Sequence, residues 1–270
     1  MRFALDLDAY LHRIGHAGPA APDLATLRAL ALAHAMAIPY ENLDPLLGLP
    51  VDLDPAALED KLVHGGRGGY CFEHNLLFAE ALRAVGFAPV GLIARVLWNR
   101  PEDAVTAQTH MLLRVPLDGA DWLVDVGFGS MTLTGALRLA PDAAQATPHG
   151  PFRLLRQGDG WRMQAQVLGE WRSLYRFDLH PCERIDYEVS NHYVSTHPQS
   201  QFVQTLAAAR CTPDARLALR NREFAVHPLG GATERCTLAR PEQILHVLES
   251  EFRIRLPRHP GLERRLAALP

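Results

Sequence analysis

Lysine is almost missing from this chain of 270 residues, in which Lys61 is the single lysine among 27 Lys and Arg side chains. Together with the abundance of Ala, this preference for Arg indicates a bias in genomic base composition, and it says nothing about function. The scarcity excludes catalysis by a lysine amine at every position except Lys61. We expect that one side chain to be solvated.

A strong charge of one sign and a long apolar run are missing as well. The net charge is -3, and basic residues are mixed with acidic ones, so we expect no nucleic-acid partner. The most apolar stretch, residues 24–38, contains Arg28 and His34 and is followed by Pro39. This pattern predicts a packed helix and no membrane partner. With no resemblance to a signal peptide at its start, the chain is expected to be cytoplasmic; its oligomeric state is left open.

Paired cysteines and metal-ligand spacings are also lacking. The chain has four cysteines, and none lie at the short spacing that zinc sites use. His192 and His197 are five residues apart, which is a poor spacing for two ligands of one metal. We therefore expect no metal site. Three cysteines are predicted to be reduced and inert: Cys182, Cys211 and Cys236.

The fourth cysteine, Cys71, lies directly after a glycine-rich segment and at the start of a predicted helix. Apolar residues at helical spacing from Cys71 to Val85, followed by Gly86, predict a helix with a left-handed cap. The first turn of a helix has unpaired N–H groups and the positive end of the helix dipole, which stabilise a thiolate. The same N–H groups can bind an oxyanion. This position favours a nucleophilic role for Cys71.

A predicted hairpin brings a histidine and a carboxylate together. Residues 110–115 and 122–126 are rich in Leu, Val, Met and Trp, and Asp118-Gly119 between them is a strong turn signal. With a two-residue turn, Asp125 lies on the same face as His110, diagonally across the strands at roughly 7 Å. An odd-length loop would separate them. Cys, His and Asp together are the groups that acyl transfer through an activated thiolate requires.

The residues around this site resemble a known family. Residues 67–75, Arg-Gly-Gly-Tyr-Cys-Phe-Glu-His-Asn, are similar to the Arg-Gly-Gly-x-Cys-x-Glu-x-Asn segment of the arylamine N-acetyltransferases. Segments 38–43, 125–129, 191–198 and 243–256 are similar to further family segments, so the resemblance runs nearly from end to end. It implies that Cys71 is the acetylated nucleophile, His110 its base and Asp125 the orienting carboxylate.

The resemblance also implies where the substrates bind. An apolar slot for a flat amine is expected to be lined by Tyr40, Phe128 and Phe202. Acyl-CoA is expected to contact Gly129 and Ser130. Loop 130–136 departs from the family pattern, because it lacks a proline that many relatives carry before the following Leu.

Polar residues near Cys71 are predicted to support its helix. Glu73 points away from Cys71 around the helix, whereas His74 comes closer to the face of the thiol. We interpret the polar residues of this segment as a buried network that fixes the helix and has no direct catalytic role. The predicted members are Arg67, Glu41, Glu73 and Asn75.

The apolar periodicity predicts an α+β fold. The first third is mostly helical, with Asp8, Asp23 and Asp54 as candidate N-caps, and from Pro89 several short strands indicate a small barrel. After Val194, strands and helices mix. The predicted parts are a helical bundle (1–86) that carries the nucleophile helix, a β-barrel (87–190) and an α/β lid (191–270), around a core like that of cysteine proteases. Segment 140–151 is predicted to be a mobile loop.

The predicted function is an acetyl-CoA-dependent N-acetyltransferase that acts on aromatic amines and hydrazines through a Cys71 acyl-thioester. Acetyl-CoA is then a co-substrate, and no bound cofactor is expected. One alternative is an amide synthase of the same family, which releases or closes a longer acyl chain and needs a larger acceptor cavity. A second alternative is a non-catalytic binding domain, in which Cys71 would react slowly with iodoacetamide.

Overall fold

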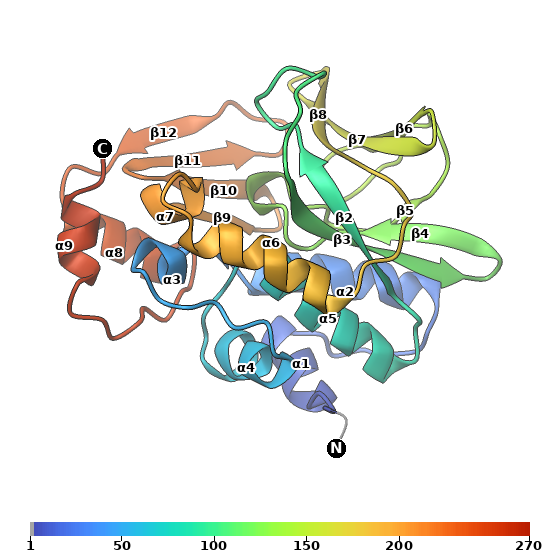
Figure 1. Ribbon diagram of the computed structural model, residues 1–270, viewed down its shortest axis with the longest axis horizontal. Coiled ribbons are helices and arrows are strands. Elements are labelled where there is room, and N and C mark those ends of the chain that lie inside the picture. The colour runs from blue at the N-terminus through green and yellow to red at the C-terminus, as the bar shows by residue number, and fades with distance from the viewer. Residues whose placement is uncertain (1–2) are drawn as a thin grey trace.

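The computed structural model describes residues 3–270 and has the predicted α+β fold. In Figure 1 most of the N-terminal helices lie in the lower part of the view, and two antiparallel sheets lie above them. The seven-stranded sheet is at the upper right, and the five-stranded sheet is at the upper left. The chain therefore forms N-terminal helices, a central barrel-like sheet and a C-terminal α/β region.

The N-terminal helices begin and end at the local signals that the sequence carries. The Asp23 side chain accepts a hydrogen bond from the Thr26 N–H, and the α5 helix ends at Gly86 with a φ of 109°. The cap of the first helix is Asp6, where we had predicted Asp8, because only Asp6 has the extended backbone of a cap. The helices are α1 (Leu7–Ile14), α2 (Leu24–Ala37), α3 (Leu43–Leu46), α4 (Pro55–Glu59), a π-helical turn (Asp60–His64) and α5 (Cys71–Val85).

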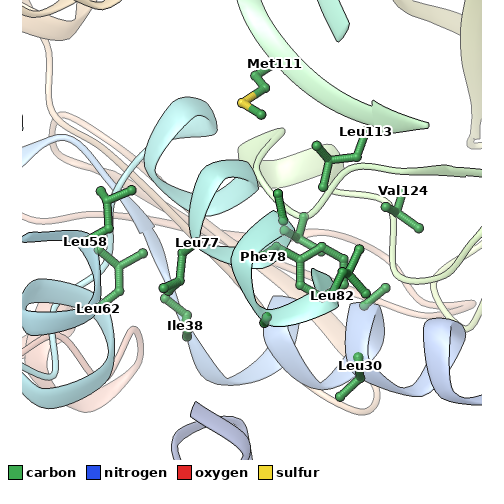
Figure 2. Packing of buried hydrophobic residues seen from close by; sticks show 14 of the residues in the cluster. Leu30, Ile38, Leu58, Leu62, Leu77, Phe78, Leu82, Met111, Leu113 and Val124 are labelled. Atoms are coloured by element: carbon green, nitrogen blue, oxygen red, sulfur yellow. The ribbon is translucent and has the colours of Figure 1, made fainter. Parts of the chain in front are cut away.

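Helix α5 is enclosed by the largest hydrophobic core. Figure 2 shows Phe78 and Leu82 of α5 close to Leu30 of α2, with Leu113 and Val124 of the barrel nearby. All five side chains are at most 1% exposed. Full burial of such a side chain contributes about 1.5–3 kcal/mol, so the packing fixes α5 between the helices and the barrel.

The central sheet is a nearly closed antiparallel barrel with the strand order β5-β4-β3-β2-β8-β7-β6. After β5, Pro141 and Gln145 form isolated bridges with Leu154 and Phe152 of β6, which connects the two edges. Buried apolar residues such as Leu112, Leu154 and Met163 belong to one core cluster. The strands are β2 (Val90–Val96), β3 (Gln108–Leu117), β4 (Ala120–Val124), β5 (Leu137–Arg138), β6 (Phe152–Gln157), β7 (Gly160–Val167) and β8 (Glu170–Phe177).

The β3–β4 hairpin has the predicted register. Leu117 pairs with Ala120, and Leu113 pairs with Val124. The turn residues Asp118 and Gly119 both have positive φ values, 50° and 72°, as a type I′ turn requires. The two-residue turn therefore places residues 110 and 125 on one face, which confirms the geometric argument.

The C-terminal sheet contains one strand from the N-terminal third. Its order is β1-β9-β10-β11-β12, and Tyr40 of β1 pairs with Ala209 of β9. Asn221, with a φ of 52°, lies in the turn between β10 and β11. The elements are β1 (Tyr40–Glu41), α7 (Gln201–Gln204), β9 (Ala207–Cys211), β10 (Ala215–Arg220), β11 (Glu223–Pro228), β12 (Glu234–Thr237), α8 (Pro241–Ser250) and α9 (Leu262–Ala267).

Two features differ from expectation. Helix α6 (Arg184–Thr196) was not predicted, and the boundary that we placed at residue 190 falls inside it. Segment 140–151, predicted to be mobile, is instead tied to the barrel by backbone hydrogen bonds, including one of 2.8 Å from the Gln145 N–H to the Phe152 carbonyl. Within residues 3–270, no helix combines the length and the apolar character that crossing a membrane requires.

Candidate active site

Cys71 is the first residue of α5 and is buried, with 3% of its surface exposed. Its Sγ lies 3.5 Å from the Thr109 carbonyl oxygen. The loop after β4 lies against it, because a Cβ atom on Gly127 would come within 2.8 Å of the Cys71 Cα. Only a glycine permits this approach, so the loop that carries Asp125 is held directly beside the start of α5.

His110 and Asp125 form a buried pair at the predicted hairpin positions. The His110 Nε2 lies 2.7 Å from the Asp125 Oδ2, and the two residues are 3% and 1% exposed. Since Nε2 faces the carboxylate, Nδ1 is the nitrogen left for the thiol. The structure thus brings Cys71, His110 and Asp125 together as predicted.

The electrostatics of this pair favour a charged imidazole. Burial alone opposes the charge, but the Asp125 carboxylate and the hydrogen bonds that His110 makes with Asp125 and Cys71 raise the pKa of His110 to about 10. Burial likewise opposes the Asp125 charge, yet His110 and donated hydrogen bonds from Gly127 and Asn75 lower the pKa of that carboxyl. The pair thus favours an imidazolium beside a carboxylate, so His110 holds the proton that it takes from the Cys71 thiol.

Asn75 joins α5 to both strands of the hairpin. Its Nδ2 donates to the Asp125 Oδ1 at 3.2 Å, to the Met111 carbonyl at 2.9 Å and to the Cys71 carbonyl at 3.1 Å. Its Oδ1 accepts from the Val126 N–H at 3.3 Å. Asn75 is therefore a support residue on the side of the catalytic groups.

The other predicted support residues form a separate ionic network. Arg67 binds Glu41 and Asp44, each at 2.8 Å, and Lys61 binds Asp44 and Glu73, each at 2.5 Å. A Glu73 oxygen also accepts the Tyr70 N–H at 3.0 Å, which caps α5 one residue before the thiol. The predicted network is thus divided, with Asn75 outside it and two unpredicted members, Lys61 and Asp44, inside it.

Lys61 is a correction to the sequence analysis. Its side chain is only 18% exposed, whereas we expected it to be solvated. Burial opposes its charge, but Glu73, Glu41 and Asp44 raise the pKa of Lys61 above the ordinary lysine value. The three carboxylates, Glu41, Asp44 and Glu73, are buried, and Arg67 alone cannot balance their charge. The need for a second buried cation is the signal that could have revealed Lys61.

Two of the three predicted aromatic residues lie close to the catalytic groups. The Phe128 ring meets the His110 ring edge-on, with centroids 4.8 Å apart, and the half-buried Tyr40 lies beside Gly129. Phe202 packs on Tyr70, the residue before the thiol, at 5.2 Å between ring centroids. Sequence reasoning missed Tyr175, whose buried ring contacts both His110 and Phe128.

The loop that holds Gly129 and Ser130 is anchored by an arginine that the sequence did not reveal. Arg216 is 6% exposed, and its Nη1 donates to the Ser130 carbonyl at 3.3 Å and to the Thr132 carbonyl at 2.9 Å. Its Nη2 donates to the His149 carbonyl at 3.2 Å. The guanidinium connects this loop to segment 140–151.

No cluster of three or more His, Cys, Asp or Glu side chains in residues 3–270 is arranged to hold a metal ion. His192 and His197 have a poor spacing for two metal ligands. In the structure the His197 ring stacks on Tyr193, with ring centroids 4.6 Å apart.

The chain is similar to known proteins over nearly its whole length. A sequence model of a family described as N-acetyltransferase matches residues 23–260. An arylamine N-acetyltransferase from Mycolicibacterium smegmatis is 51% identical over 94% of this chain and 93% of that protein. One from Escherichia coli (strain K12) is 42% identical over 91% of this chain and 88% of that protein.

Solved structures agree with this similarity. A structure of M. smegmatis arylamine N-acetyl transferase matches with a TM-score of 0.94 and 49% identity, over 98% of each chain. The structure of Mycobacterium marinum arylamine N-acetyltransferase in complex with CoA matches with a TM-score of 0.93 and 44% identity, over 97% of this chain and 98% of that one. With the sequence motifs, the Cys, His and Asp geometry and these matches in agreement, the chain belongs to the arylamine N-acetyltransferase family.

Proposed function

We propose that this chain transfers an acetyl group from acetyl-CoA to the nitrogen of an arylamine or a hydrazine by way of a thioester on Cys71. The observation that carries the proposal is the buried Cys71 at the start of α5, beside a His110 and Asp125 pair joined at 2.7 Å. Family membership and the CoA complex of the M. marinum relative support acetyl-CoA as the donor.

In the first half-reaction, His110 takes the proton of Cys71 and the thiolate attacks the thioester carbonyl carbon of acetyl-CoA. The oxyanion that forms is stabilised by N–H groups in the first turn of α5. When the tetrahedral intermediate collapses, its bond to the CoA sulfur breaks. CoA leaves with the proton that His110 held, and Cys71 carries the acetyl group.

In the second half-reaction, the amine nitrogen attacks the acetyl carbonyl on Cys71. His110 accepts the proton that the nitrogen loses, and the Cys71 sulfur leaves as a thiolate. Asp125 keeps the imidazole in one orientation and stabilises its positive charge through both half-reactions. The enzyme thereby returns to the imidazolium and thiolate form.

The surroundings of the thiol fit small substrates. Tyr40, Phe128 and Phe202 offer apolar rings for a flat acceptor, and Gly129 and Ser130 offer backbone groups for acyl-CoA. Cys71 is only 3% exposed, which suits an acetyl group better than the long acyl chain of an amide synthase. We assign the reaction to the cytoplasm, where thiols stay reduced. The division into 1–86, 87–190 and 191–270 remains a proposal.

A burst experiment tests this function. Mixing the protein with acetyl-CoA and no amine should release one equivalent of CoA rapidly and leave an acetyl group on a Cys71 peptide, visible by mass spectrometry. An aniline or a hydrazide should then discharge it. Continued release of CoA at full speed without an amine would show a thioesterase instead.

Two variants and one reagent complete the test. Cys71→Ser should fold and give no burst, because a serine hydroxyl near this base stays protonated, whereas Cys182→Ala should keep the full burst. Iodoacetamide should label Cys71 rapidly at neutral pH. Slow labelling together with the absence of a burst would favour the non-catalytic binding domain.

A further inference from the structure

Three buried polar side chains outside the catalytic groups form a continuous chain of hydrogen bonds that leads to the site. The Tyr10 hydroxyl lies 2.8 Å from the His34 Nδ1, and the His34 Nε2 lies 2.9 Å from the His74 Nδ1. The His74 Nε2 lies 3.1 Å from the Pro39 carbonyl oxygen. Tyr10, His34 and His74 are at most 1% exposed and come from α1, α2 and α5. We refer to them as the Tyr10–His74 chain.

The Tyr10–His74 chain has a fixed direction. The Pro39 carbonyl can only accept, so the His74 Nε2 donates to it and the His74 Nδ1 accepts from the His34 Nε2. The His34 Nδ1 then accepts from the Tyr10 hydroxyl. Burial lowers the pKa of His34 far below its ordinary value and lowers that of His74 to about 4, although hydrogen bonds with Pro39 and Gly69 partly oppose the latter shift. Both rings are therefore neutral at pH 7, each with its proton on Nε2.

The carbonyl at the end of this chain lies in a tight space. A Cβ atom on Gly68 would come within 1.9 Å of the Pro39 oxygen, so the carbonyl is wedged between the Gly68 backbone and the His74 ring. The close Gly68 backbone and the hydrogen bond from His74 both restrict the orientation of the carbonyl. The backbone direction at Pro39, and with it the start of the next residue, is thereby fixed.

The next residue is Tyr40, the proposed aromatic wall of the amine slot. Its ring lies nearly parallel to the His74 ring, with an interplanar angle of 12° and 6.4 Å between centroids. Tyr40 also pairs with Ala209 and forms a bridge with Gly69, and its ring lies 3.5 Å from the position of a Cβ on Gly129. His74 thus lies next to Tyr40 in two ways, through its bond to the preceding carbonyl and through the nearly parallel ring.

A purely structural role does not require this polarity. The surrounding core is apolar, and Phe78 packs edge-on against His34 with centroids 5.3 Å apart. Apolar side chains of similar volume would fill the same space without the desolvation cost of three polar groups. What they could not supply is a donor with one defined direction for the Pro39 carbonyl, next to the site.

We propose that His74 is a positioning residue for the second half-reaction: it holds the Pro39 carbonyl and the Tyr40 ring in place for the incoming arylamine, and His34 and Tyr10 fix its tautomer. This inference rests on the proposed function, because it assigns a support to the amine side of the same site. The inference requires no proton transfer along the Tyr10–His74 chain and no contact between His74 and the substrate.

The tautomers can be observed directly by NMR on protein labelled with ¹⁵N-histidine. Two histidines should show protonated Nε2 and unprotonated Nδ1 signals that stay constant between pH 5 and 8, and Tyr10→Phe should shift the His34 Nδ1 signal. Titration of both rings in that range, or a His74 ring protonated on Nδ1, would overturn the inference.

The half-reactions provide the functional test. His74→Leu should slow discharge of the acetyl-enzyme by an aniline by about tenfold or more, which is the loss expected when a buried acceptor loses its donor. Formation of the acetyl-enzyme from acetyl-CoA should stay within about threefold of wild type, because that step does not use the amine slot. His74→Gln, which keeps an amide donor, should recover part of the rate.

Matched variants separate positioning from general destabilisation. Leu27→Ala creates a cavity in the core on α2, the helix that carries His34, and removes no polar group. Both half-reactions should therefore remain near wild type at temperatures where it is folded. Tyr10→Phe keeps the volume and should slow only the amine step, by about threefold. Equal losses in both half-reactions, or an unchanged amine step in His74→Leu and Tyr10→Phe, would refute the inference. Failure of the proposed function is distinguishable, because wild type itself would then show no burst or would release CoA continuously without an amine.

Discussion

Replacement of Asp125 by Asn changes the proton pattern of the site with little change in shape. The Asp125 Oδ1 accepts hydrogen bonds from the Gly127 N–H at 3.1 Å and from the Asn75 Nδ2 at 3.2 Å. In Asp125→Asn the amide oxygen must take this position, and the amide NH₂ then faces the His110 Nε2. The His110 Nε2 has to accept a hydrogen bond, so its proton moves to Nδ1 and blocks removal of the thiol proton.

The size of the loss follows from the pKa of His110. Against the burial that opposes it, Asp125 contributes most to raising this pKa from 6.5 to about 10. That rise corresponds to roughly 5 kcal/mol in favour of the imidazolium, at about 1.36 kcal/mol for each pKa unit. Removal of the carboxylate charge should therefore slow acetyl-enzyme formation by about 10² to 10⁴, the range found for other triads.

Single-turnover release of CoA measures this rate, and circular dichroism checks that the variant is folded. A loss smaller than tenfold in a folded protein would refute the reasoning and leave Asp125 as a strand-end cap. A second readout is the unfolding free energy as a function of pH. Because the pKa of His110 is raised in the folded state, its stabilising contribution is complete below about pH 6.5 and disappears as the pH rises through about 10. Asp125→Asn should not show this decline.

Three further outcomes are expected. Lys61→Met should destabilise the protein by about 3–5 kcal/mol in urea unfolding, since it leaves buried Glu73 with no cation, and an unchanged midpoint would contradict the ionic network. Gly68→Ala should cost about 3 kcal/mol or more, because the new Cβ meets the Pro39 oxygen at 1.9 Å, whereas Gly135→Ala meets only ordinary contacts at 3.9 Å and serves as the control. The pKa of His74 is lowered from 6.5 to about 4 in the folded protein. As the pH falls, the unfolded state therefore protonates this histidine before the folded state does, and the free energy of unfolding should drop by about 3 kcal/mol between pH 6.5 and 4. His74→Leu should drop less over that range, and equal slopes would count against the neutral ring.

The elements that the sequence predicted well are those with local causes. Asp23 caps α2 and Gly86 ends α5 through contacts within a few residues, and the Asp118-Gly119 turn sets the hairpin register by backbone conformation alone. Residues 110 and 125 could therefore be placed on one face without knowledge of the rest of the chain. The nucleophile, base and carboxylate followed from these local rules.

The features that the sequence did not predict depend on distant partners. Lys61 is buried only because Asp44 and Glu73 enclose it, and Arg216 lies far along the chain from the loop that it holds. Helix α6 escaped prediction because its apolar pattern is mixed, with Ile185 and Val189 exposed at 62% and 70%. Sequence periodicity cannot predict the burial or the partners of such residues, because tertiary packing sets their environment.

The pairing of β1 with β9 sets the order in which the site is completed during synthesis. Tyr40 leaves the ribosome early, yet its partner Ala209 is made only after the entire barrel. Until then β1 is an unpaired edge, and one side of Tyr40 has no strand beside it. The nascent chain therefore carries its thiol and base before the acceptor side of the site is complete. Contacts between residues so far apart along the chain form slowly, so this pairing completes the site late in folding.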